Sequence, residues 1–363
     1  MRPKVSRRWT TGLGLDTKFS IWGVQLGVMP PFTPMEAKVQ AELPRGDAWQ
    51  YEPKWDGFRA VAFKDGDEVV IHSRNQKPLT RYFPELVPAI QRIKPKRAVL
   101  DGEIVIFTGF GTDFDAMTLR IHPAASRVNM LAAEQPATYI AFDLLADGDE
   151  SLLDRPLKER RQRLKTLLGP KPESIYLSPV TRDREVAINW LKEYRGTGLD
   201  GIVAKRVEGV YKPGERAMIK VKEQRTADCV VGGFRWGNDG KRVGSLLLGV
   251  YDGKTLQYIG HTSGFDDTQR RELVAMLEPL RGGTSFEGGR APGGPSRWSQ
   301  DRDLAWEPVR PELVCEVAFD RLENGRFRHG VGFVRWRPDK SPKSCTLAQL
   351  KAEASVELKA LFA

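Results

Sequence analysis

The order of the predicted elements changes near residue 222 of this 363-residue chain, and this change constrains the fold more than any other feature. Before it, short β-rich apolar runs are mixed with amphipathic helical patterns, whereas after it short strands follow one another with a single helix between them. Residues 222–228, where the change falls, are mostly charged or polar, as is typical of a domain boundary. We therefore predict two domains, and the chain is long enough for each to bury its own core.

The first predicted domain spans residues 28–222. Its strands are expected at 58–64, 69–73, 98–107, 138–145, 202–205 and 217–222. Its helices are expected at 83–92, 157–168 and 184–194. Because strands and helices do not alternate regularly, an α+β domain with antiparallel sheets is favoured over a doubly wound parallel sheet.

The second predicted domain, residues 223–363, consists mainly of strands. They are expected at 228–236, 245–251, 255–262, 313–319 and 332–336, with a helix at 267–277. Five short strands with one inserted helix are typical of a small β-barrel of the OB type. Residues 1–27, ahead of both domains, are basic and lack the apolar stretch of a secretory signal, so we expect a flexible arm there.

The charge balance of the chain favours a polyanionic partner. Lysine and arginine number 57 against 47 aspartates and glutamates, a formal net charge of +10, and nucleic acid is the first candidate. No apolar run approaches the length of a membrane span. Three scattered cysteines and four scattered histidines form neither a disulfide framework nor a zinc motif, so the reducing cytoplasm is the expected location.

Residues 52–59, EPKWDGFR, place a lysine and an aspartate beside aromatic and apolar residues that predict a buried sheet. An isolated charge in such a place is costly, so Lys54 and Asp56 need partners there. Taken alone, the segment fits equally well as a turn built on Asp56-Gly57, with Lys54 in solvent. Its interpretation therefore depends on the charged residues elsewhere in the chain.

Charged residues recur on strands that are otherwise apolar. Glu103 lies within LDGE, Asp200 begins DGIVAK, and Lys220 and Lys222 lie within IKVK. Successive side chains of a strand point to opposite faces, so Lys220 and Lys222 share one face. Two like charges at one place favour an anion between them, which a phosphate chain would supply. The alternative for these two lysines is an ordinary solvated strand face.

Taken in order over residues 28–343, these motifs resemble those of the covalent nucleotidyltransferases, and among them the ATP-dependent DNA ligases. The chain looks most like the short bacterial ligases of the LigC/LigD type, which lack a large N-terminal DNA-binding domain. The resemblance implies a nucleotidyltransferase (adenylation) domain followed by a C-terminal OB-fold barrel. It also implies an enzyme that seals nicks between a 5′-phosphate and a 3′-hydroxyl in DNA repair.

The resemblance makes Lys54 the nucleophile. Its attack on the ATP α-phosphorus would form lysyl-AMP and release pyrophosphate; the AMP would then pass to the nick 5′-phosphate, and the 3′-hydroxyl would displace it. The implied catalytic residues are Lys54, Asp56, Arg59, Lys220, Lys222, Arg337 and Lys340. The implied cofactor-binding residues are Glu52, Lys54, Arg59, Arg74, Glu103, Phe142, Lys205, Lys220 and Lys222. ATP and Mg²⁺, or Mn²⁺, are the implied cofactors.

Some of these residues carry a more specific expectation. Phe142 matches the ring that stacks on adenine, and Arg74 matches an arginine that helps to hold the nucleotide and the nick 5′-phosphate. Arg337 and Lys340 match an R-x-D-K signature at the end of the OB domain, which approaches the ATP pyrophosphate. Their place in the second domain implies closure for the first step and reopening for the later ones.

Glu103 and Asp200 are the implied metal residues. The family usually has Glu-Gly where this chain has Asp200-Gly201. The shorter carboxylate keeps its charge but changes its reach toward a metal ion. Whether Asp200 contacts the metal directly or through water therefore stays open.

The expected DNA contacts are Arg74, Arg235, Lys241 and Arg242. The last three lie within residues 234–242, FRWGNDGKR, where aromatic and basic residues surround a turn suited to phosphate contacts. An ordinary exposed hairpin is the alternative for this segment. We expect the partner to be nicked double-stranded DNA. We expect the protein to act as a monomer near the bacterial nucleoid, to which repair proteins would recruit it.

Other functions share parts of this pattern. RNA ligases and mRNA-capping guanylyltransferases also use Lys-x-Asp-Gly, and spacing alone does not define the base or the sugar. An NAD⁺-dependent ligase would need an additional N-terminal domain and a four-cysteine zinc finger, which this sequence lacks. A non-catalytic OB protein that binds nucleic acid would leave Lys54 and the converging lysines without a purpose.

Overall fold

The computed structural model describes residues 26–169, 174–222, 225–286, 291–292, 305–320, 322–323, 325–327, 330–350 and 356–362. It divides into two compact units, residues 1–221 with 355–363 and residues 222–354. The C-terminal residues, which we assigned to the second domain, thus belong to the first unit. The basic arm predicted at residues 1–27 lies outside the described residues except for its last two.

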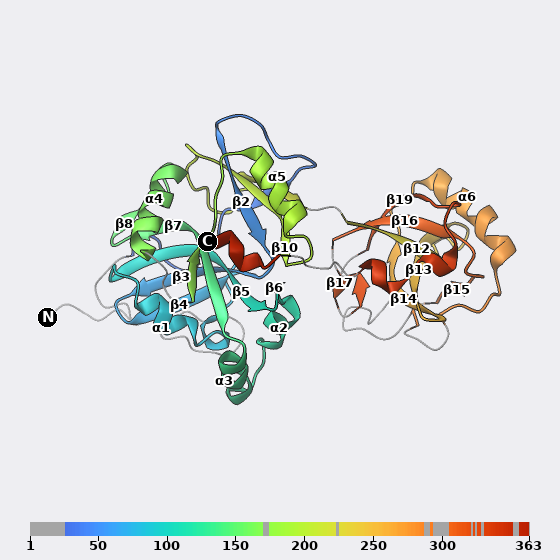
Figure 1. Ribbon diagram of the computed structural model, residues 1–363, viewed down its shortest axis with the longest axis horizontal. Helices are drawn as coiled ribbons and strands as arrows, with labels where there is room; N and C mark the ends of the chain where they lie inside the picture. The colour runs from blue at the N-terminus through green and yellow to red at the C-terminus, as the bar shows by residue number, and fades with distance from the viewer. Residues whose placement is uncertain are drawn as a thin grey trace. The chain divides into compact units, whose positions relative to one another are not determined.

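The larger sheet of the first unit is built mainly from antiparallel strands (Figure 1). Its main path, in order, is β4 (Glu68–Ser73), β3 (Phe58–Asp65), β5 (Arg97–Thr108), β7 (Ala137–Asp147) and β8 (Glu150–Ser151). The short strand β6 (Gly111–Thr112) pairs with β5, and β9 (Ile175–Leu177) runs parallel to β7. The antiparallel sheet predicted for this domain is therefore confirmed.

A second sheet of four strands completes the first unit. Its order is β1 (Ala37–Val39), β11 (Met218–Lys222), β10 (Leu199–Arg206) and β2 (Trp49–Trp55). Strands β10 and β2 are antiparallel, whereas β1 and β11 are parallel. In β11 the residues Ile219 and Val221 are buried, while Lys220 and Lys222 are partly exposed on the opposite face, as the alternation predicts.

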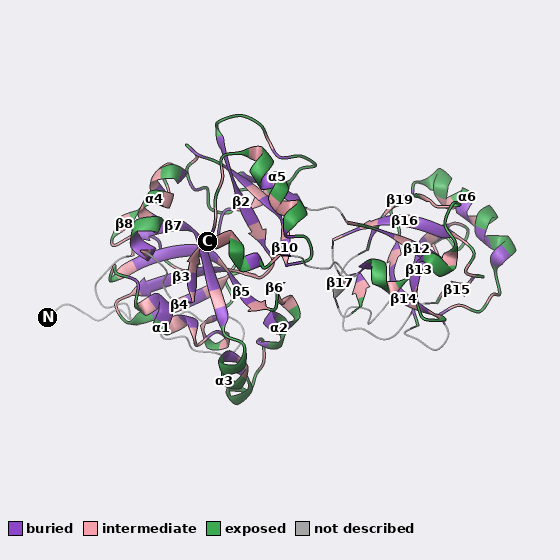
Figure 2. Ribbon diagram, in the orientation of Figure 1, coloured by how far each residue is buried: buried purple, intermediate pink, exposed green. Residues whose placement is uncertain are grey.

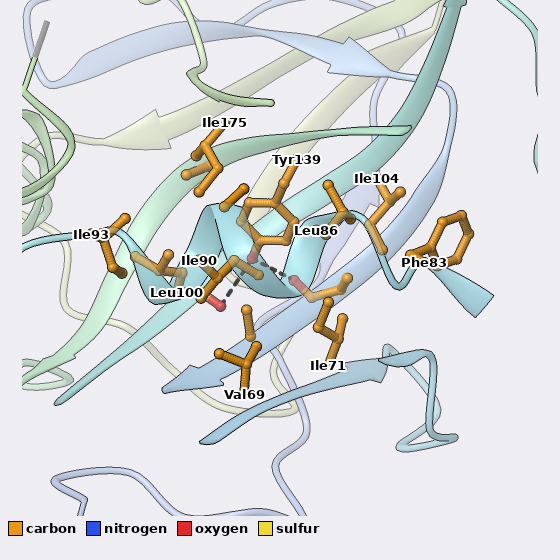
Figure 3. Packing of buried hydrophobic residues seen from close by; sticks show 14 of the residues in the cluster. Val69, Ile71, Phe83, Leu86, Ile90, Ile93, Leu100, Ile104, Tyr139 and Ile175 are labelled. Carbon is orange, nitrogen blue, oxygen red and sulfur yellow. Dashed lines mark hydrogen bonds between the residues drawn. The ribbon is translucent and has the colours of Figure 1, made fainter. Parts of the chain in front are cut away.

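Helices cover the sheets of the first unit, and their outward faces are exposed whereas β5 and β7 are mostly buried (Figure 2). They are α1 (Leu86–Gln91), α2 (Phe114–Leu119), α3 (Ala125–Glu134), α4 (Leu157–Leu168) and α5 (Arg184–Glu193), with 3₁₀ turns at η1 (Thr80–Tyr82) and η5 (Leu358–Phe362). Leu86 and Ile90 of α1 pack on the larger sheet around Tyr139, whose hydroxyl donates to the carbonyls of Ala60 and Leu100 at 2.9 and 3.1 Å (Figure 3). Because this buried phenol has its hydrogen bonds satisfied, the polar group is accommodated in an apolar core.

The second unit is the expected OB-type arrangement. Its strands β14 (Thr255–Thr262), β13 (Val243–Asp252), β12 (Arg225–Trp236), β16 (Val314–Phe319) and β19 (Gly332–Trp336) are neighbours in that order and antiparallel. A bridge between Thr262 and Val331 joins the last residue of β14 to the residue before β19, so the sheet curls on itself. Helix α6 (Asp267–Leu277) begins at a capping box formed by Asp266 and Gln269.

Short elements fill the rest of the second unit. They are β15 (Glu307–Pro308), β17 (Leu322–Glu323), β18 (Arg326–Phe327), η2 (Glu278–Leu280), η3 (Pro342–Ser344) and η4 (Leu347–Leu350). Apolar residues from β12, β13, β16 and α6 form the core of this unit. Across the described part of the chain, no helix has both the length and the apolar character needed to cross a membrane.

Candidate active site

The contact between Lys54 and Asp200 is built by a β-bulge. In the β2–β10 pairing, Leu199 lies opposite Trp55 and Gly201 lies opposite Lys54, so Asp200 is the extra residue of β10. A bulge redirects a side chain that regular pairing would point elsewhere. Here the Lys54 Nζ donates to the Asp200 Oδ2, and both side chains are less than a quarter exposed. The departure Asp200-Gly201 therefore gives a carboxylate in direct contact with Lys54.

The packing of the same segment requires a glycine at position 57. It lies between β2 and β3, and a β-carbon at this position would lie 2.1 Å from the carbonyl oxygen of Ile104. No side chain fits so close to the backbone of β5. The backbone bends at Gly57 without forming a hydrogen-bonded turn, and Lys54 beside it is held by Asp200 rather than free in solvent.

Arg59 is fixed by two residues to which sequence reasoning assigned no role, Asp101 and Tyr211. The Arg59 guanidinium donates to both carboxylate oxygens of the fully buried Asp101 at 2.7 and 2.6 Å. The Tyr211 hydroxyl also donates to Asp101, at 2.6 Å, and burial together with the Asp101 charge raises the pKa of that phenol well above its usual value. A carboxylate on the apolar strand β5, as in LDGE, was the sequence signal available for Asp101.

Glu103 lies opposite Arg59 in the β3–β5 pairing and lines the same pocket as Lys54. Burial raises the pKa of its carboxyl to about 7, with the charges of Arg59 and Lys54 opposing the shift and those of Asp101 and Asp200 adding to it. Such a group is poised between its protonated and ionised forms near neutral pH. It can therefore bind a cation or donate a hydrogen bond, depending on what occupies the pocket.

Phe142 of β7 lies next to two cations. The Arg59 guanidinium is 4.6 Å and the Lys205 ammonium 4.5 Å from the centroid of its ring. Lys205 in turn donates to Glu52 at 2.8 Å, and Gln50 donates to the other oxygen of Glu52 at 3.0 Å. Lys205 and Glu52 are almost fully buried, so this ion pair and the ring form one wall of the pocket.

A single pocket gathers most of the predicted cofactor residues. Its lining includes Glu52, Lys54, Arg59, Arg74, Glu103, Phe142, Lys205 and Lys220. Sequence reasoning did not single out Met35, Glu36 or Met218, which also line it. Lys222, which the division of the chain places in the second unit, does not line this pocket and contacts Asp320 instead. The pocket thus has an apolar ring, paired carboxylates and several cations, a combination suited to a nucleoside polyphosphate.

The predicted signature residues of the second unit form their own cluster. Arg337 donates to both oxygens of Asp339 at 2.9 and 2.8 Å and to Asp228 at 2.8 Å. The Lys340 ammonium lies 3.5 Å from the Asp228 carboxylate. Hydrogen bonding from Arg337 lowers the pKa of Asp339 to about 2, so this carboxylate is ionised at any physiological pH.

The predicted DNA contacts of the second unit differ in their surroundings. Arg242 donates to Asp239 at 2.6 Å and to Asp267 at 2.7 Å, so its charge is already paired. Arg235, at the opposite end of the segment, lies near Tyr258, whose pKa is raised by burial against the charges of Arg235 and Arg326. Lys241 is exposed. The turn predicted in this segment is present between β12 and β13.

Glu103 and Asp200, the two carboxylates predicted to hold a metal ion, are close enough for the charge of Asp200 to raise the pKa of Glu103. Within the described ranges, no group of three or more His, Cys, Asp or Glu side chains is arranged to hold one. A hard cation prefers oxygen ligands and commonly completes its shell with water and substrate phosphates. The two carboxylates therefore fit a cation that arrives with a phosphate ligand better than one held by protein alone.

The sequence matches known proteins over nearly its whole length. Residues 33–222 match the family described as ATP dependent DNA ligase domain, and residues 239–340 match the ATP dependent DNA ligase C terminal region. DNA ligase C of Mycobacterium tuberculosis is 48% identical over 355 residues, which cover 92% of this chain and 98% of the relative. DNA ligase C1 of Mycolicibacterium smegmatis is 46% identical over 346 residues, with the same two coverages.

The fold is shared with a solved Lig E DNA ligase, with a TM-score of 0.53 and 20% identity over 84% of this chain and 99% of that one. The resemblance seen in the motifs is therefore confirmed, together with the dependence on ATP and a divalent metal that it implied. This chain belongs to the ATP-dependent DNA ligases, and within them to the short bacterial enzymes of the LigC/LigD type.

Proposed function

We propose that Lys54 is the residue of this ligase that becomes adenylated, and that the pocket around it binds ATP. The observation that carries this proposal is the position of Lys54: it lines the pocket with Phe142 and Lys205, and it donates to Asp200. The Lys54 ammonium gives a proton to Asp200, the freed amine nitrogen attacks the α-phosphorus, and a P–N bond forms. The bond from the α-phosphorus to the bridging oxygen breaks, pyrophosphate leaves, and the second proton of the nitrogen passes to solvent. Asp200 orients the attacking nitrogen and accepts its hydrogen bond as the new bond forms.

The later steps use the same AMP. An oxygen of the nick 5′-phosphate attacks the lysyl-AMP phosphorus, the P–N bond breaks, and the amine of Lys54 is released. The 3′-hydroxyl then attacks the 5′-phosphate, forms the phosphodiester and expels AMP, while its proton passes to a base. Arg74 lines the pocket, which supports the proposal that it contacts the nucleotide and the nick phosphate.

The walls of the pocket support specific nucleotide contacts. We assign adenine to the Phe142 ring, where stacking suits a planar base, and the buried Glu52–Lys205 pair lies beside it. We assign the ribose to Arg59 and Glu103, which lie opposite one another on β3 and β5. Lys220 supplies a cation for the phosphates from β11. In this assignment the planar base meets an aromatic ring, the ribose hydroxyls meet charged side chains, and the phosphates meet a cation.

For the metal we propose Mg²⁺, with Mn²⁺ as a substitute, held by Glu103 and Asp200 together with ATP phosphates. The oxygen-only donor set supports a hard cation, and a pKa near 7 allows Glu103 to ionise when a cation is present. When bound, the ion would neutralise charge on the phosphates. We also propose that the carboxylate of Asp56 assists Glu103 and Asp200 at the metal ion.

For Lys222, Arg337 and Lys340 we propose the roles that the family motifs imply, at the ATP phosphates and the leaving pyrophosphate. In this structure each has acidic partners: Asp320 for Lys222, and Asp228 for the other two. Such partners keep cations in defined rotamers until a phosphate competes for them. Charge neutralisation on a leaving pyrophosphate would favour the first step.

For DNA we propose that Arg235 and Lys241 contact the backbone of nicked double-stranded DNA, with Arg242 contributing only if it exchanges its two aspartate partners. Such contacts are salt-dependent and independent of base sequence. We further propose a monomer that acts in DNA repair in the bacterial cytoplasm and is recruited by repair proteins. The bacterial relatives and the three free cysteines support this location.

The experiment for the assignment of Lys54 is covalent labelling. The protein is incubated with Mg²⁺ and α-labelled ATP, GTP or NAD⁺, denatured, and tested for label on the polypeptide. We expect label from ATP, loss of label in Lys54→Ala, and full labelling in Lys165→Ala, which changes an exposed lysine of α4. Labelling of Lys54→Ala, or labelling by GTP alone, would refute the proposal.

A further inference from the structure

The C-terminal turn η5 packs against the first unit (Figure 1). The backbone amide of Leu358 donates to the carbonyl of Phe110 at 2.7 Å, and the Leu358 side chain is fully buried. The Phe362 ring is stacked on Trp55, with centroids 5.2 Å apart and planes 10° apart, and lies 4.8 Å from the ring of Tyr176. A segment at the end of the chain thus contributes two apolar anchors to the unit that holds Lys54.

The residues under this turn are next to the Lys54–Asp200 pair in the sequence. Trp55, Leu199 and Leu358 belong to one buried cluster, which the partly buried Phe362 joins. Trp55 follows Lys54, and Leu199 precedes Asp200; these two apolar residues are also opposite each other in the β2–β10 pairing. Trp55 lines the pocket together with Lys54. Because successive side chains of a strand point to opposite faces, its indole lies on the face of β2 opposite the Lys54 side chain.

The bulge at Asp200 needs support from packing. The extra residue of a bulge is left out of the regular hydrogen-bond ladder, so its position depends on its neighbours. Gly201, directly after it, has a φ of +152°, a conformation that L side chains rarely adopt. Trp55, opposite Leu199, is fixed at one edge by the hydrogen bond from its indole nitrogen to Ser178 at 3.0 Å. The Phe362 ring covers a face of the same indole.

We propose that residues 356–362 position the nucleophile: by holding Trp55 and Leu199 from the far side of the sheet, they fix the bulge that directs Asp200 onto Lys54. Leu358 and Phe362 are positioning residues in this role, because neither lines the pocket. The inference rests on the proposed assignment of Lys54 as the residue that becomes adenylated. It goes beyond that assignment by giving the C-terminal segment a part in the first chemical step.

The C-terminal segment should affect the formation of lysyl-AMP but not the final sealing of the nick. Formation of lysyl-AMP needs the amine of Lys54 aligned with Asp200, and a misplacement of about 1 Å can cost on the order of 100-fold in rate. Sealing of a nick that already carries AMP does not use that amine as a nucleophile. Loosening the bulge should therefore slow self-adenylation while leaving the sealing of a pre-adenylated nick largely intact.

The test uses Phe362→Ala and Leu358→Ala in the full chain, with Glu357→Gln as the matched control because Glu357 is exposed on the same segment. Single-turnover self-adenylation is measured over a range of ATP concentrations, beside the sealing of a synthetic pre-adenylated nick. We expect the rate at saturating ATP to fall roughly tenfold, with the half-saturating ATP concentration unchanged. We expect pre-adenylated sealing to stay within about twofold, and the conservative Phe362→Tyr to restore the rate because it keeps the stacked ring.

Thermal unfolding of each variant separates positioning from a merely structural role. If Leu358→Ala does not fold, Phe362→Leu, which keeps the apolar bulk and loses the stacked ring, provides the same comparison. Equal losses in self-adenylation and pre-adenylated sealing, following the fraction unfolded, would overturn the proposal, as would unchanged self-adenylation in a folded Phe362→Ala. Labelling of Lys54→Ala would instead refute the assignment of Lys54, so the two failures are distinguishable.

Discussion

Lys54 and Asp200 are 146 residues apart in the sequence and meet in an ion pair because β10 carries one extra residue opposite β2. Strands β2 and β10 are neighbours in the four-stranded sheet, and Lys54 of β2 lines the pocket. A carboxylate in direct contact with the lysine restricts the rotamers of the lysine side chain. The chemistry proposed for this enzyme therefore depends on a local irregularity of the sheet.

Removing the charge of Asp200 should slow the first step. In Asp200→Asn the amide keeps the size of the side chain but no longer accepts as an anion, so we expect self-adenylation to fall roughly 100-fold. Asp200→Glu should reduce the rate of self-adenylation less than Asp200→Asn, because it keeps the negative charge. Single-turnover labelling with ATP measures both variants, with the exposed Asp252→Asn as control. A rate in Asp200→Asn equal to that of the unmodified enzyme would contradict the role given to this ion pair.

Replacing Gly57 should destabilise the first unit. The added β-carbon of Gly57→Ala would lie 2.1 Å from the Ile104 carbonyl oxygen, so the strands must shift, at a cost of roughly 1–3 kcal/mol in the free energy of unfolding. Gly264→Ala is the matched control, because its added β-carbon would have no atom within 4 Å and should change stability by less than about 0.5 kcal/mol. Urea titrations of both variants measure the difference. Equal unfolding free energies for Gly57→Ala and Gly264→Ala would show that the β5 backbone shifts to accommodate the added β-carbon without a loss of stability.

Glu103 should make stability depend on pH. Its pKa is raised to about 7 in the folded protein from an ordinary value of 4.5, so the folded state binds more protons than the unfolded state between these values. Stability contributed through Glu103 is thus greatest at low pH and declines as the pH rises from 4.5 to 7. We expect the unfolding free energy of the unmodified protein minus that of Glu103→Gln to decrease over this window by a few kcal/mol at most.

The measurement for Glu103 is a set of urea titrations of both proteins at pH 4.5, 5.5, 6.5 and 7.5 without metal. The difference between the proteins isolates Glu103 from other groups that titrate in the same range. A difference that rises with pH would mean that the folded pKa lies below 4.5, and that the charges of Arg59 and Lys54 outweigh the burial of this carboxyl.

The support of Arg59 should be measurable through Tyr211. Tyr211→Phe removes the hydroxyl that donates to Asp101 at 2.6 Å, and we expect a loss of about 1.5–3 kcal/mol because the acceptor is a charged, fully buried carboxylate. Asp101→Asn should cost more, since it leaves the Arg59 guanidinium without its anionic partner. Tyr251→Phe in the second unit is the control. Stability unchanged in Tyr211→Phe would show that water replaces the hydroxyl.

Arg235 and Arg242 should differ in DNA affinity although they lie in one segment. Arg242 is paired with Asp239 and Asp267, so Arg242→Ala should weaken binding to a nicked duplex less than Arg235→Ala. Loss of one phosphate contact lowers the slope of log affinity against log salt by about 0.9. Fluorescence anisotropy over a range of salt concentrations measures this slope. A larger change in this slope for Arg242→Ala than for Arg235→Ala would mean that the DNA contacts Arg242 rather than Arg235.

Much of the fold was predictable because local signals coincide with the elements. Helix α4 has the predicted bounds 157–168, after Pro156 at its N-cap, and α6, β14 and β19 also match their predicted ranges. Helix α3 was missed because Ala124, its N-cap, makes no side-chain cap and only Val128 and Ala132 are buried. Strand β9 was missed because three residues carry too little periodicity to identify a strand.

The site was predictable in its residue types but not in its contacts. Lysines and carboxylates on apolar strands identified Lys54, Glu103 and Lys220 as candidates, and these three line one pocket. The bulge at Asp200 depends on the register of two strands far apart in the sequence, which no local pattern encodes. The return of Phe362 to Trp55 is likewise a contact between distant residues, so the C-terminal segment was assigned to the wrong unit.

The central claim is that AMP becomes attached to Lys54, and mass spectrometry of the protein after reaction with ATP and Mg²⁺ tests it most directly. The reacted protein is digested under conditions that preserve the phosphoramidate bond, and the peptides are sequenced by fragmentation. We predict that the mass of one AMP is found on Lys54 alone. AMP on Lys205, Lys220 or any other residue, with Lys54 unmodified, would contradict the account.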